Sequence, residues 1–280
     1  MTTPPDFVVV GHVAKDITPT GYTIGGTVTY AAATVRRLGL RAAIVTSAAA
    51  DLDLSPLAGI QVHRVPSEAT TTFENIYHGW RRTQYLRAVA SPLDCAAIPD
   101  VWETSPSVLL GPLAQEVAPD IVDCFPHSLM GITPQGWMRA WGADGRVHPT
   151  AWTSAEQVLS RADVLVYSEE DVGGDETVIQ AFGRLARLMV VTRGPSGADV
   201  FQNGTVTHFP AYAGQEVDPT GAGDVFAAAF LVRLRETGDP FQAAPFANAT
   251  SSFAIEGPGI STLPTREQVL ARVAAGRVKD

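Results

Sequence analysis

The chain has 280 residues, of which 45% are apolar, and it carries a formal net charge of −9. This length and apolar content allow a sizeable α/β core and exclude wholesale disorder. The negative charge argues against a nucleic-acid partner or an anionic membrane, since both need a basic face. No stretch of about 18 apolar residues occurs, and the first residues lack the basic segment of a signal peptide. We therefore expect a cytoplasmic protein.

Two cysteines occur, Cys95 and Cys124. Two cysteines do not make a disulfide framework, and their wide spacing does not match a zinc-binding pattern. The sequence therefore predicts two free or buried thiols in a reducing compartment. The six histidines are scattered without a helical i, i+4 pair, so they give no sign of a metal site.

The first part of the chain predicts a strand, a short ribbon, a helix and a second strand. The apolar run Phe7–Val10 is typical of a buried central strand. The segment Asp16–Ile24 is rich in β-formers around a proline and a glycine, which favours a short hairpin. Gly25 and Gly26 precede a helical pattern over Thr27–Leu38, and Ala42–Thr46 is a second apolar run. Neither a G-x-G-x-x-G string nor a Walker A loop is present, which argues against a dinucleotide-dependent oxidoreductase.

The segment Thr70–Arg87 interrupts the strand–helix alternation. It is rich in aromatic and β-branched residues, among them Phe73, and His78-Gly79 is a turn signal. This pattern predicts a hairpin that leaves the main sheet. Its aromatic side chains have two interpretations of equal weight, cover for a substrate or packing within a lid or dimer contact.

Further strands and helices follow in alternation. Apolar runs predict strands at 107–110, 129–133, 164–167 and 188–192, a hairpin at 198–209, helices at 241–255 and 265–274, and weaker helical segments at 116–123 and 135–141. Strands alternating with helices indicate an open, largely parallel sheet with helices on both faces. Ligands of such sheets bind beyond the carboxyl ends of the strands. The polar segments that follow strands, Asp16, 168–171, 193–194 and 221–224, are therefore expected to meet at one rim.

The most informative stretch is D-P-T-G-A-G-D, residues 218–224, followed by an apolar helical run from Val225 to about Leu234. The glycines fall where a helix starts, and unpaired N–H groups and the positive end of the helix dipole favour an anion there. Asp224 would repel a phosphate unless it has a chemical task, and removing a proton from an attacking hydroxyl is such a task. The alternative is that Asp224 merely caps the first turn.

This string resembles the C-terminal signature of the PfkB (ribokinase-like) family of carbohydrate kinases. The N-terminal order of strand, aspartate, ribbon, Gly-Gly pair and helix is similar to the same family, and the likeness covers nearly the whole chain. It implies one ribokinase-like α/β domain over 1–280, with a mainly parallel central sheet, helices on both faces and a small β lid at about 12–26 and 70–88. It also implies transfer of the γ-phosphoryl of ATP to a hydroxyl of a small polyol or sugar.

The resemblance also assigns roles to residues of this chain. It implies Asp224 as the general base beside an anion hole at Gly221, Ala222 and Gly223. Asp16 would hold the acceptor, and Gly25 and Gly26 would form the hinge of the lid. The remaining residues it implies are Tyr30 and Phe73 at the acceptor, and Thr192, Arg193, Gly194, Gly197 and Asn248 along the ATP.

One departure concerns the metal. Many family members carry N-x-x-E after the strand that ends here at Tyr167, whereas this chain has Ser168 and Asp171. Carboxylates remain at Glu170 and Asp171, so a hydrated Mg²⁺ can still be attracted; the alternative is a solvated acidic helix start. The altered motif also raises the hypothesis of a non-catalytic binding relative, which the intact Asp224 disfavours.

The acceptor is less defined than the reaction. Tyr30 stands where many sugar kinases of the family carry asparagine, and Gly-Gly-x-x-x-Tyr together with the segment Gln135–Arg139 resembles the inositol-kinase branch. A sugar or a nucleoside remains an alternative acceptor. The resemblance leaves open a monovalent cation as a further cofactor, and either a monomer or a homodimer formed through the lid.

Overall fold

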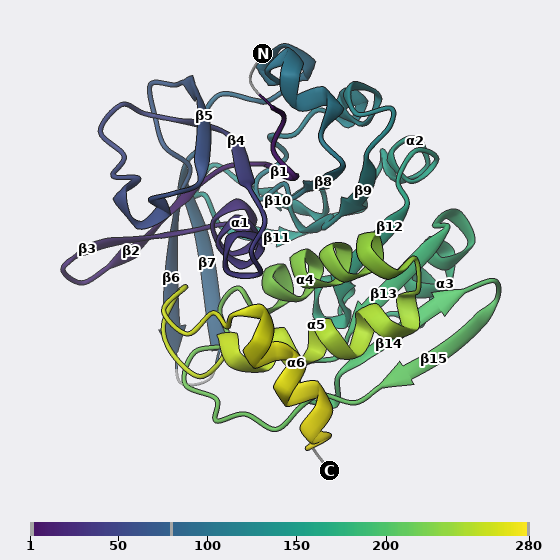
Figure 1. Ribbon diagram of the computed structural model, residues 1–280. Helices are drawn as coiled ribbons and strands as arrows, with labels where there is room; N and C mark the ends of the chain where they lie inside the picture. Colours follow the sequence, from purple (N-terminus) through teal and green to yellow (C-terminus); the bar gives the residue numbers. More distant parts are fainter. Residues whose placement is uncertain (1–2, 79–80, 279–280) are drawn as a thin grey trace.

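A nine-stranded sheet forms the centre of the molecule (Figure 1). The computed structural model describes residues 3–78 and 81–278. The strand order is β15-β14-β13-β12-β9-β8-β1-β4-β5, and all strands from β13 to β5 run parallel. Their bounds are β1 Phe7–Val10, β4 Ala42–Ala48, β5 Gln61–Pro66, β8 Ser107–Leu110, β9 Leu129–Ile132, β12 Val164–Ser168, β13 Leu188–Thr192, β14 Ala198–Gln202 and β15 Thr205–Phe209.

Alternate residues of these strands enter two separate cores, one on each face of the sheet. Val9 and Ile44 pack on one side with α1 (Thr27–Arg37) and α4 (Ala222–Thr237), whereas Val8 and Val10 pack on the other. The first face is also covered by α5 (Pro240–Ala254) and α6 (Arg266–Ala275), and the second by α2 (Ala155–Leu159) and α3 (Glu176–Leu185). Because successive side chains of a strand point to opposite faces, a strand with both faces covered is a continuous apolar run. The predicted fold class is confirmed.

The two ribbons predicted outside the main sheet lie together in one four-stranded sheet, here called the lid (Figure 1). Its order is β3-β2-β6-β7, with β2 Ala14–Thr18, β3 Gly21–Gly25, β6 Thr72–His78 and β7 Arg81–Ala88. β2 runs parallel to β6 and places Asp16 beside Phe73. Gly79, part of the predicted turn, lies outside the described residues.

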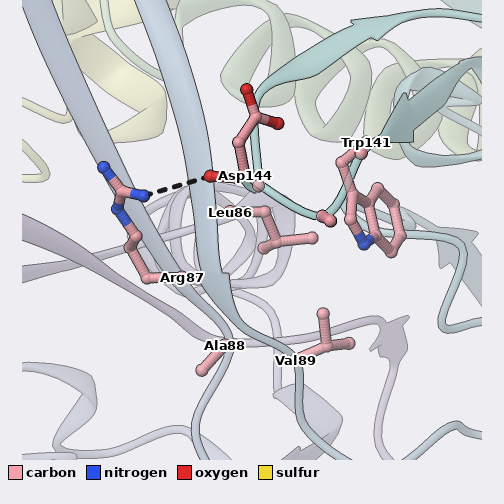
Figure 2. Close-up of a pocket in the computed structure, with 9 residues that line it drawn as sticks. Leu86, Arg87, Ala88, Val89, Trp141 and Asp144 are labelled. Atoms are coloured by element: carbon pink, nitrogen blue, oxygen red, sulfur yellow. Dashed lines mark hydrogen bonds between the residues drawn. The ribbon is translucent and has the colours of Figure 1, made fainter.

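A short hairpin continues the lid where the sequence predicted a helical turn over 135–141. Only Gln135–Met138 is helical, as a 3₁₀ turn, and β10 (Arg139–Trp141) pairs with β11 (Val147–Pro149). The hairpin loop contacts β7, because the N–H of Leu86 donates to the carbonyl of Gly145 at 2.8 Å. A pocket of about 370 Å³ lies at this junction, and Figure 2 shows residues that line it. Residues 86–89 and 141–145 line it, and none of the predicted site residues does.

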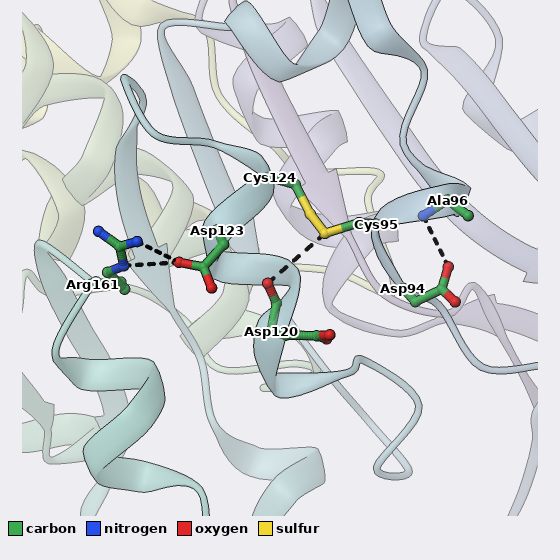
Figure 3. The surroundings of a disulfide bond; sticks show 7 residues. All are labelled: Asp94, Cys95, Ala96, Asp120, Asp123, Cys124 and Arg161. Carbon is green, nitrogen blue, oxygen red and sulfur yellow. Dashed lines mark hydrogen bonds and ion pairs between the residues drawn. A yellow bond between two sulfur atoms is a disulfide. The ribbon is translucent and has the colours of Figure 1, made fainter.

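The prediction of two free thiols is wrong, because Cys95 and Cys124 form a disulfide (Figure 3). Cys95 lies in the 3₁₀ turn Cys95–Ala97 and Cys124 ends the 3₁₀ turn Pro119–Cys124, with a Cα–Cα distance of 5.9 Å. Backbone bonds between Leu93 and the 116–118 segment bring the two turns together. Closing a loop of 29 residues stabilises the folded chain by about 3–4 kcal/mol in the chain-entropy account.

The other 3₁₀ turns are Ser55–Leu57, Asp100–Thr104, Glu169–Val172 and Gly194–Ser196. The weakly helical segment predicted at 116–123 is helical only as the 3₁₀ turn Pro119–Cys124. Within residues 3–78 and 81–278, none of the helices has both the length and the apolar character needed to cross a bilayer.

Candidate active site

The start of α4 is an open helix N-terminus. Its N-cap, Gly221, has φ 79°, and a Cβ atom there would clash with the ring of Tyr30. No heavy atom lies within 4 Å of a Cβ added at Gly223, so this side of the turn is bare. The N–H of Ala222 bonds the carbonyl of Pro219 at 3.2 Å, which makes Gly223 and Asp224 the better placed N–H donors for an anion. The helix begins three residues before the predicted Val225, because the left-handed Gly221 ends the turn.

Asp224 lies half-buried in this first turn. Burial raises the pKa of its carboxyl to about 6, and the charge of Asp171 raises it too. A hydrogen bond with the side chain of Thr27 and the charge of Arg139 act in the opposite direction on the same pKa. A carboxylate with this pKa is a stronger base than an ordinary aspartate and is still ionised at neutral pH.

The acceptor residues predicted from the sequence lie around Asp16, and Tyr30 links this group to Asp224. The carboxylate of Asp16 sits against Gly25, where a Cβ atom would clash with Oδ2. Tyr30 is buried, and burial together with the charges of Asp224 and Asp16 raises the pKa of its phenol. This ring is therefore within electrostatic reach of both carboxylates. Phe73 is buried and lies opposite Asp16 in the lid register.

Two polar side chains of the lid, not singled out from the sequence, extend this group. Asn75 donates from Nδ2 to Oδ1 of Asp16 at 3.4 Å, and Gln84 donates from Nε2 to Oδ1 of Asn75 at 3.1 Å. Amide groups next to a carboxylate offer both donors and acceptors to hydroxyl groups. In the strand register, Asn75 lies two residues after Phe73, the partner of Asp16, and Gln84 lies opposite Asn75. The sequence alone could not predict this grouping, because it depends on the pairing of β2 with β6.

Arg139 lies close to these groups, although the sequence did not identify it individually. Its guanidinium lies 5.7 Å from the ring centroid of Phe73, Nη1 donates to the carbonyl of Leu113 at 3.3 Å, and its charge lowers the pKa of Asp224. It therefore supplies a positive charge between the lid and the start of α4. The only sequence feature that pointed to Arg139 was its place in the segment Gln135–Arg139, which resembles the inositol-kinase branch.

The second glycine of the predicted hinge pair is sterically required. Gly26 has φ 90°, and a Cβ atom there would lie 2.6 Å from the carbonyl oxygen of His12 and 2.8 Å from Cδ1 of Leu113. A side chain would therefore separate the lid from the body. The next residue, Thr27, begins α1 and contacts Asp224, so the predicted hinge lies next to the turn that carries the predicted base.

The residues predicted to lie along the ATP differ in how tightly other protein groups surround or bind them. Gly194 has φ 50° and open space around it, whereas Gly197 is packed against the carbonyl oxygen of Phe209. Thr192 donates from its hydroxyl to the carbonyl of Tyr167 at 3.4 Å. Arg193 forms ion pairs with Glu169 at 2.5 Å and Asp199 at 2.6 Å, which hold it in a carboxylate network.

Asn248, expected beside an adenine, is only 4% exposed. Its Nδ2 donates to the carbonyls of Phe209 at 3.0 Å and Pro210 at 3.1 Å. Both hydrogens of the amide are thus used to hold the segment after β15. The side chain fixes this segment rather than offering its N–H groups to a ligand.

The two carboxylates predicted for a metal have different surroundings. Glu170 is exposed, whereas Asp171 is half-buried and accepts from the N–H of Ser168 at 3.0 Å and from Nε2 of Gln135 at 2.9 Å. No group of three His, Cys, Asp or Glu side chains able to hold a metal occurs among residues 3–78 and 81–278. A Mg²⁺ here would therefore take most of its ligands from phosphate oxygens and water, as this ion commonly does.

The raised pKa of Asp224 predicts a loss of activity at acidic pH. If the ionised carboxylate is the base, kcat/KM should fall about tenfold per pH unit below an apparent pKa near 6. A pH profile from 4.5 to 8.5 with saturating donor measures this limit, and the residual rate of Asp224→Asn should lack it. A rate that stays constant down to pH 5 would contradict the assignment of the base.

The chain is similar to known proteins both in sequence and in structure. Residues 144–266 match the model of the pfkB family carbohydrate kinases. The matched part contains Asp224 and the glycine turn. The expectation from the sequence is thereby confirmed.

Similar curated proteins include a fructokinase of Klebsiella pneumoniae, 38% identical over 93 residues that make up 30% of each chain. A nucleoside kinase of Methanocaldococcus jannaschii is 34% identical over 92 residues, 32% of this chain and 30% of that protein. The matches span about a third of these relatives' length.

Solved structures align over almost the whole chain. A pyrophosphate-dependent kinase in the ribokinase family, complexed with a pyrophosphate analogue and myo-inositol, has a TM-score of 0.75 at 24% identity and covers 95% of this chain and 99% of that one. Ribokinase of Arabidopsis thaliana with ribose and ATP has a TM-score of 0.74 at 20% identity, covering 97% and 99%. The chain therefore has the ribokinase fold.

Proposed function

We propose that this protein is a kinase that transfers the γ-phosphoryl group of ATP to a hydroxyl of a small polyol or sugar, with myo-inositol or a sugar favoured. The observation that carries the proposal is Asp224, a carboxylate with a raised pKa at an open, glycine-lined helix N-terminus. A binding module has no use for a base at an anion site. This argues against the alternative of a non-catalytic relative.

In this proposal each group has one task. Asp16 binds acceptor hydroxyls, and Asp224 takes the proton from the hydroxyl that attacks the phosphorus. The N–H groups of Gly223 and Asp224, together with Arg139, stabilise the negative charge on the transferred phosphoryl group. Asp171 would hold the water shell of a Mg²⁺, which neutralises charge on the donor phosphates.

The acceptor class follows from the polar groups around Asp16. A carboxylate beside the amides of Asn75 and Gln84 suits a ligand with several neighbouring hydroxyls. Myo-inositol is named for one similar structure and ribose for another. A nucleoside, the substrate class of a similar curated kinase, is the alternative.

The identity of the phosphoryl donor, ATP or pyrophosphate, must be tested separately from the acceptor. Both N–H groups of Asn248 are engaged by backbone carbonyls, which weakens the case that this side chain binds adenine. Pyrophosphate, named for a similar structure, should therefore be tested beside ATP. The same base and anion site would serve either donor.

The deciding experiment is a panel of myo-inositol, fructose, ribose and a nucleoside, each with Mg²⁺ and either ATP or pyrophosphate. Mass spectrometry of the phosphorylated acceptor reports the transfer. We expect transfer to a polyol or sugar, which is lost in Asp224→Asn. If no acceptor is phosphorylated by either donor, the proposed function is wrong and binding alone becomes the better hypothesis.

The lid gives a further prediction. If it closes over the acceptor by bending at Gly25 and Gly26, amide hydrogens of residues 16–26 and 72–78 should exchange more slowly when acceptor binds, because closure excludes water. Hydrogen exchange with and without acceptor measures this, and β15 at the far edge of the main sheet is the internal control. Protection that follows protein concentration and ignores the acceptor would instead indicate a homodimer formed through the lid.

A further inference from the structure

Glu116 is a buried carboxylate to which the proposed mechanism gives no task. It is 3% exposed and follows β8 in the loop 111–116. Its two oxygens accept from the N–H groups of Leu113 at 2.9 and 3.0 Å, Ala114 at 2.6 Å and His12 at 3.1 Å. These donors belong to two segments, since His12 lies between β1 and β2. Burying a carboxylate is costly unless its hydrogen bonds are made, so this side chain imposes a definite shape on both segments.

The loop shaped by Glu116 holds Arg139 at two points. The carbonyl of Leu113 accepts from Nη1 of Arg139 at 3.3 Å, and Nε2 of Gln115 donates to the backbone carbonyl of Arg139 at 2.5 Å. Gln115 adopts φ 57°, a left-handed conformation that is unusual for residues other than glycine. The geometry of the loop therefore sets where the guanidinium lies.

The second segment bound by Glu116 carries the lid. The carbonyl of His12 and the side chain of Leu113 form the surface against which Gly26 packs. The His12 ring bonds the hydroxyl of Thr71 at 2.6 Å and the carbonyl of Ser91 at 3.0 Å, next to the two ends of the β6–β7 hairpin. Both lid ribbons thus leave the body of the protein beside this carboxylate.

We propose that Glu116 is a positioning residue for phosphoryl transfer, which fixes Arg139 and the Gly26 hinge around the acceptor through the loop 111–116. The inference rests on the proposed function. It goes beyond that function by assigning a role to a side chain that touches neither substrate nor donor. Because the hydrogen bonds of Glu116 are to backbone groups, its effect is on distances within the site rather than on the chemistry itself.

The test is a double-mutant cycle between Glu116→Gln and Arg139→Ala. In the otherwise unchanged protein, Glu116→Gln should lower kcat/KM for the acceptor about 10- to 100-fold, the cost of a small misplacement in a catalytic site. The same substitution should change kcat/KM much less when Arg139 is already alanine. Equal losses in both backgrounds would overturn the proposal and leave Glu116 as a purely structural group.

The matched control is Asp163→Asn. Asp163 also holds a backbone N–H, that of Met130 at 2.8 Å, but at the amino-terminal edge of the sheet where β9 and β12 begin. The Asp163→Asn substitution should lower the melting temperature without changing kcat/KM. If Glu116→Gln does not fold, Gln115→Gly enters the same cycle, since glycine tolerates the left-handed backbone and the substitution removes the side chain whose amide bonds the carbonyl of Arg139. Asn203→Gly, at φ 52° in the β14–β15 turn, is its control.

A second measurement is independent of turnover. The Nε–H resonance of Arg139, assigned with Arg139→Lys in protein labelled with ¹⁵N-arginine, should change position and exchange faster with water in Glu116→Gln and Gln115→Gly but not in their controls. An unchanged resonance would overturn the positioning role. If wild-type protein phosphorylates no acceptor, the proposed function fails, and this resonance still decides whether Glu116 positions Arg139.

Discussion

Replacing Asp224 by asparagine should lower kcat about 10²–10⁴-fold, the usual contribution of a general base. Asparagine has the same shape but cannot accept the proton of the attacking hydroxyl. The KM for the donor should change little, because the N–H groups of the first turn of α4 remain in place. Steady-state kinetics with the best acceptor of the panel measure both constants.

Stability provides the control for this variant. The folded-state pKa of Asp224 is raised above its ordinary value of 3.8 to about 6. Because the folded state then holds this proton more tightly than the unfolded state, Asp224 stabilises the fold below pH 3.8. This stabilisation is lost as the pH rises through 6. Asp224→Asn should therefore melt no lower than the wild type at pH 8. Asp123→Asn, which removes a carboxylate that pairs with Arg161 on the surface, should keep full activity. A wild-type kcat in Asp224→Asn would refute the role of the base.

Replacing Asp16 by alanine should weaken acceptor binding about 10- to 150-fold, with ATP binding unchanged. Each hydrogen bond to a charged group contributes about 1.5–3 kcal/mol, and this carboxylate lies beside the amide of Asn75 in the proposed acceptor site. Calorimetric titration of acceptor and of donor, each alone, separates the two effects.

Asp51→Ala is the matched control for Asp16→Ala. Asp51 pairs with Lys15, the neighbour of Asp16 on the opposite side of the same lid strand, at 3.3 Å. Its removal should leave acceptor binding unchanged. Equal losses of acceptor and donor affinity in Asp16→Ala would mean that Asp16 holds the lid rather than the acceptor.

The sequence by itself determined the elements whose signals are local. The continuous apolar runs of β1, β12 and β13 indicate strands covered on both faces, and the structure confirms them. Gly221 and Gly26 were equally readable as breaks before helices, and both adopt positive φ angles that favour glycine. These local features sufficed to predict the fold class and the helix start that carries the proposed base.

Only the tertiary structure decided which distant side chains meet. The disulfide joins cysteines 29 positions apart, and nothing in the sequence around either one indicates the partner. Asn248 binds carbonyls about 40 positions away, which the sequence cannot show for a residue within a helix. Arg139 reaches Phe73 and the vicinity of Asp224 because the segment after Met138 pairs as a hairpin instead of continuing its helical turn. Strand pairing and burial are non-local interactions, so a helical pattern over seven residues is too weak to outweigh them.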